Sequence, residues 1–162
     1  MPSRVVVTAD AAALLDQLRD RHGPLMFHQS GGCCDGSSPM CYAQGDFIVG
    51  DRDVLLGVLD VDGGVPVWIS GPQFQVWKHT QLVIDVVPGR GSGFSLEAPE
   101  GKRFLSRGRA FTDRENAELA AASVITGADY ERGERLSLRA PVVASAVDAC
   151  PVAAGRAAPV KP

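Results

Sequence analysis

The sequence is short of several features that mark large protein classes, and each shortage excludes one of them. No apolar run in its 162 residues approaches the roughly 20 residues that a membrane-spanning helix needs. The net charge is only −3, so the chain lacks the basic surface that neutralises phosphates, and we expect no nucleic-acid partner. Residues 1–10 have neither the basic start nor the apolar segment of a signal peptide. These absences predict a cytoplasmic protein without membrane contact.

What the chain does have indicates one folded domain. Hydrophobic residues make up 45% and charged residues 22%, which is enough for a packed core, and 18 glycines with 11 prolines predict many turns. Three consecutive valines at positions 5–7 predict a short strand. The next apolar residues are spaced as one stripe of an amphipathic helix that ends at Gly23-Pro24: Ala11, Leu14, Leu15 and Leu18.

From residue 25 onward the pattern is mainly that of β-strands. Seven strands are predicted, at residues 25–29, 42–49, 54–59, 65–70, 81–87, 94–97 and 103–111. Their connections look too short for helical crossovers, which favours antiparallel pairing, and a capping box at Thr112 predicts one more short helix. We therefore expect an α+β fold, mainly antiparallel β as a small barrel or sandwich, in residues 1–126. Residues 127–162 are predicted to form a flexible tail.

The segment from His28 to Cys41 is the part of the chain best suited to chemistry. Three of the four cysteines, Cys33, Cys34 and Cys41, fall within nine positions of this segment. Glycine, serine and proline surround them and favour a loop that brings the sulfur atoms near one another. Thiolates and imidazole suit zinc, copper or iron, so we expect a transition-metal site, which His79 can complete from elsewhere in the fold.

Two other interpretations of this segment stay open. Adjacent cysteines rarely both reach one metal, because the peptide between them is planar and stiff, and this favours a reversible disulfide of Cys41 with Cys33 or Cys34. Alternatively, the cysteines are small buried hydrophobic residues, and His28 is a core histidine of an apolar strand. The sequence does not decide between metal, thiol and packing roles.

Other patterns point less directly to a site. Arg103, Arg107 and Arg109 share one face of the predicted strand 103–111, where they can bind an acidic partner or simply face the solvent. The glycines at positions 89, 91 and 93 are not spaced as in a phosphate-binding loop, so a hairpin is expected there. No G-x-S-x-G motif is present, and the sequence therefore does not predict a Ser/His/Asp triad.

Several stretches of the chain resemble the motifs of a small bacterial family of unknown function. They read MFHQSGGCCDGSSPMC at 26–41, WKHTQLVIDVVPGRG at 77–91, FSLE at 94–97 and RFL at 103–105, and the likeness runs from about residue 5 to residue 120. Genes of this family often lie beside genes of NAD-dependent aldehyde dehydrogenases. The resemblance therefore implies, by association, an accessory role near aldehyde oxidation.

Three functions are compatible with these observations. The first is an accessory protein of an aldehyde dehydrogenase that uses the cysteine and histidine segment to hold a metal or exchange thiols, with the arginine row as a candidate contact. The second is a small metal- or thiol-dependent enzyme acting on an aldehyde or a thiol adduct. The third is a homo-oligomeric binding module without chemistry.

Overall fold

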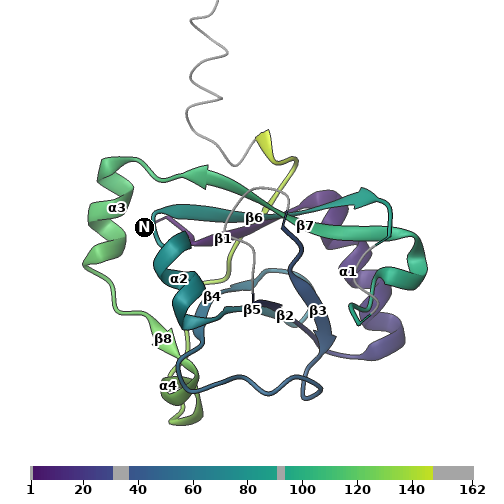
Figure 1. Cartoon of the computed structure of the whole chain (residues 1–162), viewed down its shortest axis with the longest axis horizontal. Helices are drawn as coiled ribbons and strands as arrows, with labels where there is room; N and C mark the ends of the chain where they lie inside the picture. The colour runs from purple at the N-terminus through teal and green to yellow at the C-terminus, as the bar shows by residue number, and fades with distance from the viewer. Residues whose placement is uncertain (1, 31–36, 91–93, 148–162) are drawn as a thin grey trace, which may run out of the picture.

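Two β-sheets, one above the other in Figure 1, form the body of the protein. The computed structural model describes residues 2–30, 37–90 and 94–147. The four-stranded sheet contains, in spatial order, β7 (Lys102–Ala110), β6 (Thr80–Pro88), β1 (Val5–Thr8) and β9 (Val142–Val143). The five-stranded sheet contains β3 (Met40–Ala43), β2 (Leu25–Gln29), β5 (Val65–Ile69), β4 (Val54–Leu59) and β8 (Ile125–Thr126). The predicted α+β class is confirmed, as two sheets and not as a closed barrel.

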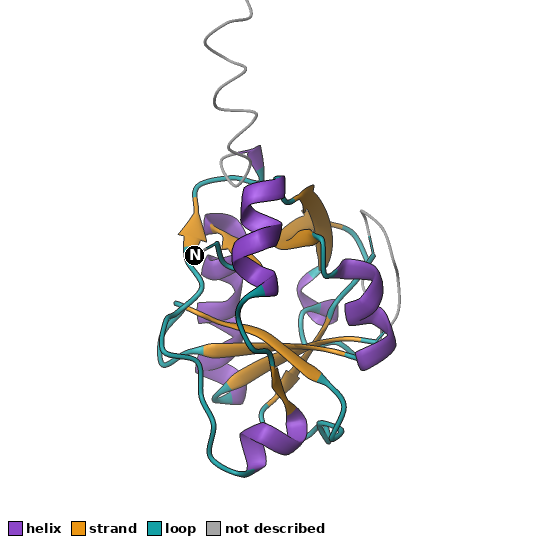
Figure 2. Ribbon diagram, turned by 90° about the vertical axis from the view of Figure 1, so that its left-hand side faces the viewer, coloured by secondary structure: helices purple, strands orange, loops and turns teal. Residues whose placement is uncertain are grey.

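The helices lie around the sheets. They are α1 (Ala9–His22), α2 (Gly71–Trp77), α3 (Asp113–Ala120) and α4 (Gly127–Glu131), and a single 3-10 turn, η1 (Ala98–Glu100), precedes β7. Figure 1 shows α1 on one side of the sheets and α2 and α3 on the other, and Figure 2 gives the view turned by 90°. None of the helices within the described ranges is both long and apolar enough to cross a membrane.

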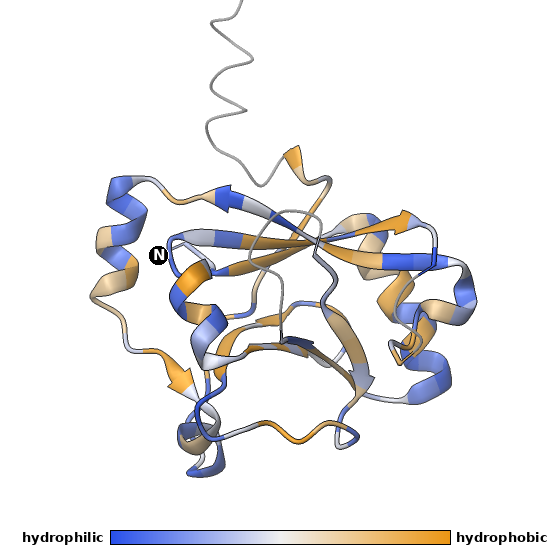
Figure 3. Cartoon of the chain, in the orientation of Figure 1, coloured by the Kyte–Doolittle hydropathy of each residue, from blue (hydrophilic) through white to orange (hydrophobic). Residues whose placement is uncertain are grey.

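The first helix forms as the sequence predicted. The Thr8 hydroxyl caps α1 by accepting a hydrogen bond from the Ala11 amide at 3.3 Å, and Gly23, with φ of 78°, ends the helix in a conformation that favours glycine. The predicted apolar stripe is the buried face of α1: Ala11, Leu14, Leu15 and Leu18. By contrast, α3 is mostly hydrophilic in Figure 3 and has Leu119 as its buried residue.

The strand pairing is more mixed than predicted. β1 pairs in parallel with both β6 and β9, and β2 pairs in parallel with β5, whereas the remaining pairs are antiparallel. The short connections suggested antiparallel neighbours, but β1 and β6 are far apart in the sequence, and most of the five-stranded sheet is built between them. A parallel pair needs a long crossover, and here the intervening strands supply it.

The main core fills the space between the two sheets. Phe27 from β2 meets Phe104 from β7 edge to face, with ring centroids 4.9 Å apart, and both side chains are fully buried. A second, smaller cluster lies on the other face of the five-stranded sheet and contains Met26, Leu55, Trp68 and Ile125. Both faces of this sheet are therefore covered, and neighbouring residues of one strand enter different environments.

The folded part of the chain extends beyond the boundary predicted at residue 126. β9 pairs with β1, and Ala140 is buried, with its amide donating to Val58 at 2.7 Å and its carbonyl accepting from Asp60 at 2.9 Å. The alanine- and valine-rich composition concealed this segment, because a strand of two residues has no periodicity to detect. Residues 148–162 of the predicted tail lie outside the described ranges.

Candidate functional site

Of the residues predicted to hold a metal, the structure describes Cys41, His28 and His79, and it does not bring these three side chains together. Cys33 and Cys34 lie outside the described residues. The register of β2 and β3 pairs Phe27 with Cys41 and His28 with Met40, so Cys41 and His28 point to opposite faces of one sheet. His79 directly precedes β6 in the other sheet. Within the described ranges, no group of three or more His, Cys, Asp or Glu side chains is placed to hold a metal ion.

Cys41 occupies a packing position. Its side chain is fully buried in the main core, and its amide donates to the Ser95 hydroxyl at 2.9 Å. Ser95 in turn donates to the buried carboxylate of Glu97, which also accepts the Phe104 amide at 3.0 Å. Burial, and to a lesser degree the charge of Glu97, raises the pKa of the Cys41 thiol well above its ordinary value. A thiol held in its protonated form is a poor ligand and a poor nucleophile.

His28 belongs to a hydrogen-bonded group that the sequence did not reveal. Its side chain is only 3% exposed, as a core histidine would be, and its ring lies against Phe47 with centroids 4.4 Å apart. Nε2 lies 2.9 Å from Asp53 Oδ2, and Nδ1 lies 2.5 Å from Ser30 Oγ. The same Asp53 oxygen accepts the Gly50 amide at 2.9 Å. No spacing rule links residues 28 and 53, because Asp53 precedes β4, two strands away from β2 across β5.

Arg109 is engaged within the protein. It is 8% exposed and binds both carboxylate oxygens of Glu115, at 2.9 and 3.0 Å, while its Nε donates to Gln81 at 3.0 Å. Hydrogen bonds from Arg109, acting against partial burial, lower the pKa of Glu115 to about 2. The guanidinium of Arg109 therefore holds α3 against β7.

Arg103 and Arg107, the other members of the predicted row, precede Arg109 in β7. The Nε of Arg107 donates to Asp85 on β6 at 2.8 Å. Burial alone would raise the pKa of Asp85, but hydrogen bonds from Arg107, the Val86 amide and Thr8 hold it below its usual range. Arg103 is partly buried. The contact of this arginine row with a partner stays a prediction.

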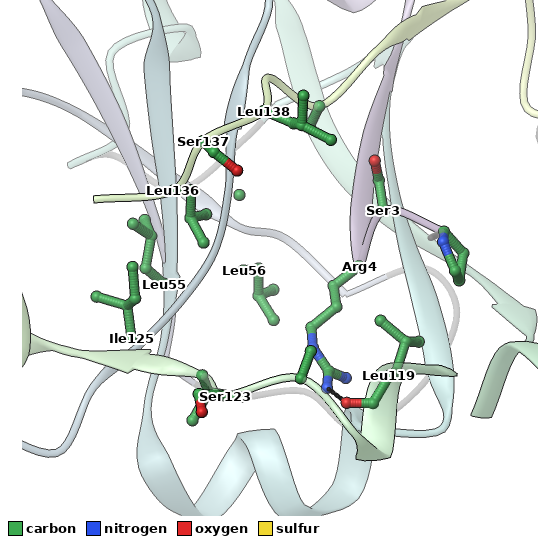
Figure 4. Close-up of a pocket in the computed structure, with 15 residues that line it drawn as sticks. Ser3, Arg4, Leu55, Leu56, Leu119, Ser123, Ile125, Leu136, Ser137 and Leu138 are labelled. Atoms are coloured by element: carbon green, nitrogen blue, oxygen red, sulfur yellow. Dashed lines mark hydrogen bonds between the residues drawn. The ribbon is translucent and has the colours of Figure 1, made fainter. Parts of the chain in front are cut away.

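A cavity of about 290 Å³ opens between the two sheets near the start of β1. Figure 4 shows Leu55, Ile125 and Leu136 on one side of it and Arg4 with Leu119 on the opposite side. Its polar lining groups include the hydroxyls of Ser3, Ser123 and Ser137, and no acidic side chain of the described ranges lines it. An apolar cavity with few polar groups is the usual form of a small-molecule site.

Arg4 is the charged residue of this cavity. Its Nη1 donates to the Lys78 carbonyl at 3.3 Å and its Nη2 to the Leu119 carbonyl at 3.4 Å, both longer than an average hydrogen bond. Its guanidinium lies 5.1 Å from the centre of the Phe74 ring. Burial lowers the pKa of Arg4 from its ordinary value. Among the residues that the structure describes, no carboxylate pairs with it.

Arg4 also lines a second cavity of about 270 Å³. Lys78 and His79 lie in its wall, so the structure places His79 beside Arg4 and not beside Cys41 or His28. His79 is exposed, and its Nδ1 lies 3.2 Å from Asn116 Oδ1. Like the first cavity, this one is lined by no Asp or Glu from the part of the chain that the structure describes. Two adjoining cavities thus combine an apolar wall with two basic side chains and a histidine.

One feature of the sequence, which is not a motif, points to this site. Arg4 directly precedes the three valines of β1, all of them buried, so a charged residue stands at the start of a fully buried strand. Such a residue must find a partner or a cavity at the strand end.

Comparisons with known proteins identify a family. The family model described as "Domain of unknown function (DUF779)" matches residues 14–110 of this chain. No match was found among curated proteins or among solved structures.

Proposed function

This chain belongs to the family described as Domain of unknown function (DUF779), and from the geometry of its cavities we propose that it binds a small aliphatic carboxylate. The observation that carries the proposal is Arg4, a half-buried guanidinium that lines both cavities and has no carboxylate partner within the described part of the chain. A desolvated cation is costly unless an anion approaches it. A bound carboxylate would supply that anion.

The lining of the cavities defines the rest of the ligand. The larger cavity offers leucine, isoleucine, valine and alanine side chains, which suit a hydrocarbon tail. At the Arg4 end, Lys78 adds a second positive charge and His79 a hydrogen-bonding ring, and no acidic residue of the described ranges lines this end. An anion with an apolar tail satisfies both halves, and arginine can bind its two oxygens with two parallel hydrogen bonds.

This ligand class agrees with the accessory role that the resemblance implies. Aldehyde oxidation turns an aldehyde into a carboxylate, so a carboxylate-binding protein fits beside an aldehyde dehydrogenase. We propose the link to that enzyme on the resemblance and on this chemical agreement. Direct contact with the dehydrogenase, and a homo-oligomeric state, stay predictions of the same kind.

Isothermal titration calorimetry with sodium octanoate tests the proposal, with 1-octanol as a neutral probe of similar shape. Arg4→Gln removes the charge and keeps a polar side chain with an amide donor. We expect octanoate to bind Arg4→Gln about 10- to 100-fold more weakly than the wild type, the loss that a charge-assisted hydrogen bond of about 1.5–3 kcal/mol implies. Binding of 1-octanol should change little.

The matched control is Arg139→Gln, which removes an arginine that is half exposed and lies 3.9 Å from Asp60. This variant should bind octanoate as the wild type does. If the wild type binds no octanoate, or if Arg4→Gln and the wild type bind it equally, the carboxylate proposal is wrong. Circular dichroism on each variant verifies that the fold is retained.

Metal or thiol chemistry at Cys33 and Cys34 remains a separate proposal from the sequence. Cys41 is buried and its thiol pKa is raised, and both features disfavour its participation in such chemistry. Elemental analysis of anaerobically purified protein tests the metal. Zinc, copper or iron at about one equivalent per chain, lost in Cys33→Ser and retained in Cys41→Ala, would support a site that needs Cys33 and not Cys41.

A further inference from the structure

The group formed by Ser30, His28 and Asp53 lies apart from both cavities, and none of the three residues lines either of them. Ser30 follows the end of β2 and is exposed, whereas His28 on the same strand is almost fully buried. The imidazole therefore connects the hydroxyl of an exposed serine with a largely buried carboxylate, whose side chain is 15% exposed.

The hydrogen bonds fix the tautomer of the histidine. A carboxylate can only accept hydrogen bonds, so the 2.9 Å contact with Asp53 requires the proton on Nε2. In the neutral form of the ring Nδ1 is an acceptor, and the Ser30 hydroxyl, 2.5 Å away, is placed to donate to it. The Gly50 amide holds the Asp53 oxygen from a second direction at 2.9 Å. Each group is thus oriented by the next.

We propose that Ser30 is a nucleophile for acyl transfer from small carboxylic esters, with His28 as its general base and Asp53 as a positioning residue. Ser30 Oγ attacks the ester carbonyl carbon while its proton passes to His28 Nδ1. The bond from carbon to the leaving oxygen then breaks, and that oxygen takes the proton from Nδ1, leaving an acyl-Ser30. Water repeats the sequence: it gives a proton to His28, its oxygen bonds to the carbonyl carbon, and Ser30 Oγ leaves and recovers the proton.

The exposure of Ser30 distinguishes this role from simple satisfaction of a buried histidine. A buried imidazole needs two hydrogen-bond partners, and a buried partner would meet that need equally well. Here the Nδ1 partner is the hydroxyl of Ser30, a residue exposed at the surface. The roles of the two ring nitrogens are exchanged relative to the common serine hydrolase arrangement, but each still performs the same task, one oriented by a carboxylate and one accepting from serine.

A fluorophosphonate probe, which forms a covalent bond with activated serine hydroxyls, tests the proposal on the full chain. We expect mass spectrometry to locate the adduct on Ser30, and Ser30→Ala to remove it. Ser38→Ala is the matched control, since Ser38 is an exposed serine of the same region, and it should label as the wild type does. Hydrolysis of p-nitrophenyl acetate should fall at least 100-fold in His28→Gln, the lower limit of a general-base contribution.

Nuclear magnetic resonance of protein with ¹⁵N-labelled histidine tests the tautomer without any variant. The proton of His28 should reside on Nε2 in the wild type, and Asp53→Asn, whose amide can donate to Nε2, should move it to Nδ1 and slow labelling of Ser30. A purely structural histidine would leave the labelling rate unchanged. No adduct on any serine, an adduct only on another serine, or Nδ1–H in the wild type would overturn the proposal.

Discussion

Arg4 and Arg109 occupy similar places in the fold and differ in one respect. Each arginine lies in the four-stranded sheet or at its margin, each is withdrawn from solvent, and each lies over a phenylalanine ring, Arg4 over Phe74 and Arg109 over Phe111. Arg109 meets the carboxylate of Glu115 with two hydrogen bonds. Arg4 meets two backbone carbonyls at 3.3 and 3.4 Å.

The difference separates a structural arginine from a candidate ligand-binding one. Arg109 also donates to Gln81, so several of its donors are used by well-aligned partners and its charge is neutralised inside the protein. Arg4 lies beside two cavities and has no carboxylate partner among the residues that the structure describes. Both arginines are withdrawn from solvent, so burial does not distinguish them. The groups that accept their hydrogen bonds do distinguish them.

The largest effect should come from removing each guanidinium in turn. Arg109→Leu leaves the partly buried Glu115 without its cation and should lower the free energy of unfolding by about 3 kcal/mol, the lower end of the cost of breaking a buried pair. Arg4→Leu loses two long hydrogen bonds and should cost about 1 kcal/mol. Urea denaturation at pH 7 measures both. Equal losses would mean that Arg4 is as structural as Arg109, and the distinction would fail.

A smaller effect is expected from the acid side of the Arg109 pair. The folded pKa of Glu115 is about 2, against an ordinary value of 4.5, so the unfolded chain takes up this proton first as the pH falls. The pair therefore stabilises the fold above about pH 4.5, and the contribution is lost as the pH falls toward 2.

Glu115→Gln should show this dependence directly. At pH 7 it should be less stable than the wild type by about 1–3 kcal/mol, between the values for exposed and buried charge-assisted pairs. The deficit should shrink as the pH approaches 2. Glu134→Gln, which removes an exposed carboxylate 3.8 Å from Arg132, should show almost no deficit. Urea denaturation across this pH range measures the difference, and a deficit that does not depend on pH would contradict the assignment.

The smallest effect should come from giving Arg4 the carboxylate that Arg109 already has. Ala122 lines both cavities that Arg4 lines, so Ala122→Glu would introduce a carboxylate into the lining that the two residues share. A partly exposed pair should raise the free energy of unfolding by up to about 1 kcal/mol. It should also prevent octanoate binding, and the neutral Ala122→Gln should do so less. Octanoate binding by Ala122→Glu at wild-type affinity would place the carboxylate away from Arg4.

Much of the fold could be predicted because local signals were strong. The helix that Thr8 caps and Gly23 ends, and the capping box at Thr112, form where the sequence places them. β2 and β4 also match their predicted limits. Pairing could not be predicted, because local hydrophobic pattern says which residues form strands but not which distant strand lies beside them. Residues 42–49 and 94–97 were predicted as strands, whereas β3 ends at Ala43 and the later segment forms turns just before η1.

The candidate sites depended on contacts between distant residues and were predicted less well. His28 was singled out for its nearness to cysteines, and the structure instead gives it Asp53, 25 residues away. Three arginines were singled out for sharing a face of one strand, yet Arg4, outside that row, is the one that lines the cavities. The absence of G-x-S-x-G excluded only one local way of presenting a serine, and not a Ser/His/Asp contact assembled from separate segments.

The position of β1 in its sheet has a consequence for the order in which the protein folds. This strand, at residues 5–8, lies between β6 and β9, whose residues are 80–88 and 142–143. During synthesis β1 therefore has no native neighbour in its sheet until β6, at residues 80–88, has left the ribosome, and it gains the second only when residues 142–143 follow. Such distant contacts slow folding and leave an apolar strand exposed to premature association. Helix α1 directly follows β1 in the sequence and needs only local contacts for its cap at Thr8. It can therefore form early and give the nascent segment its first local structure.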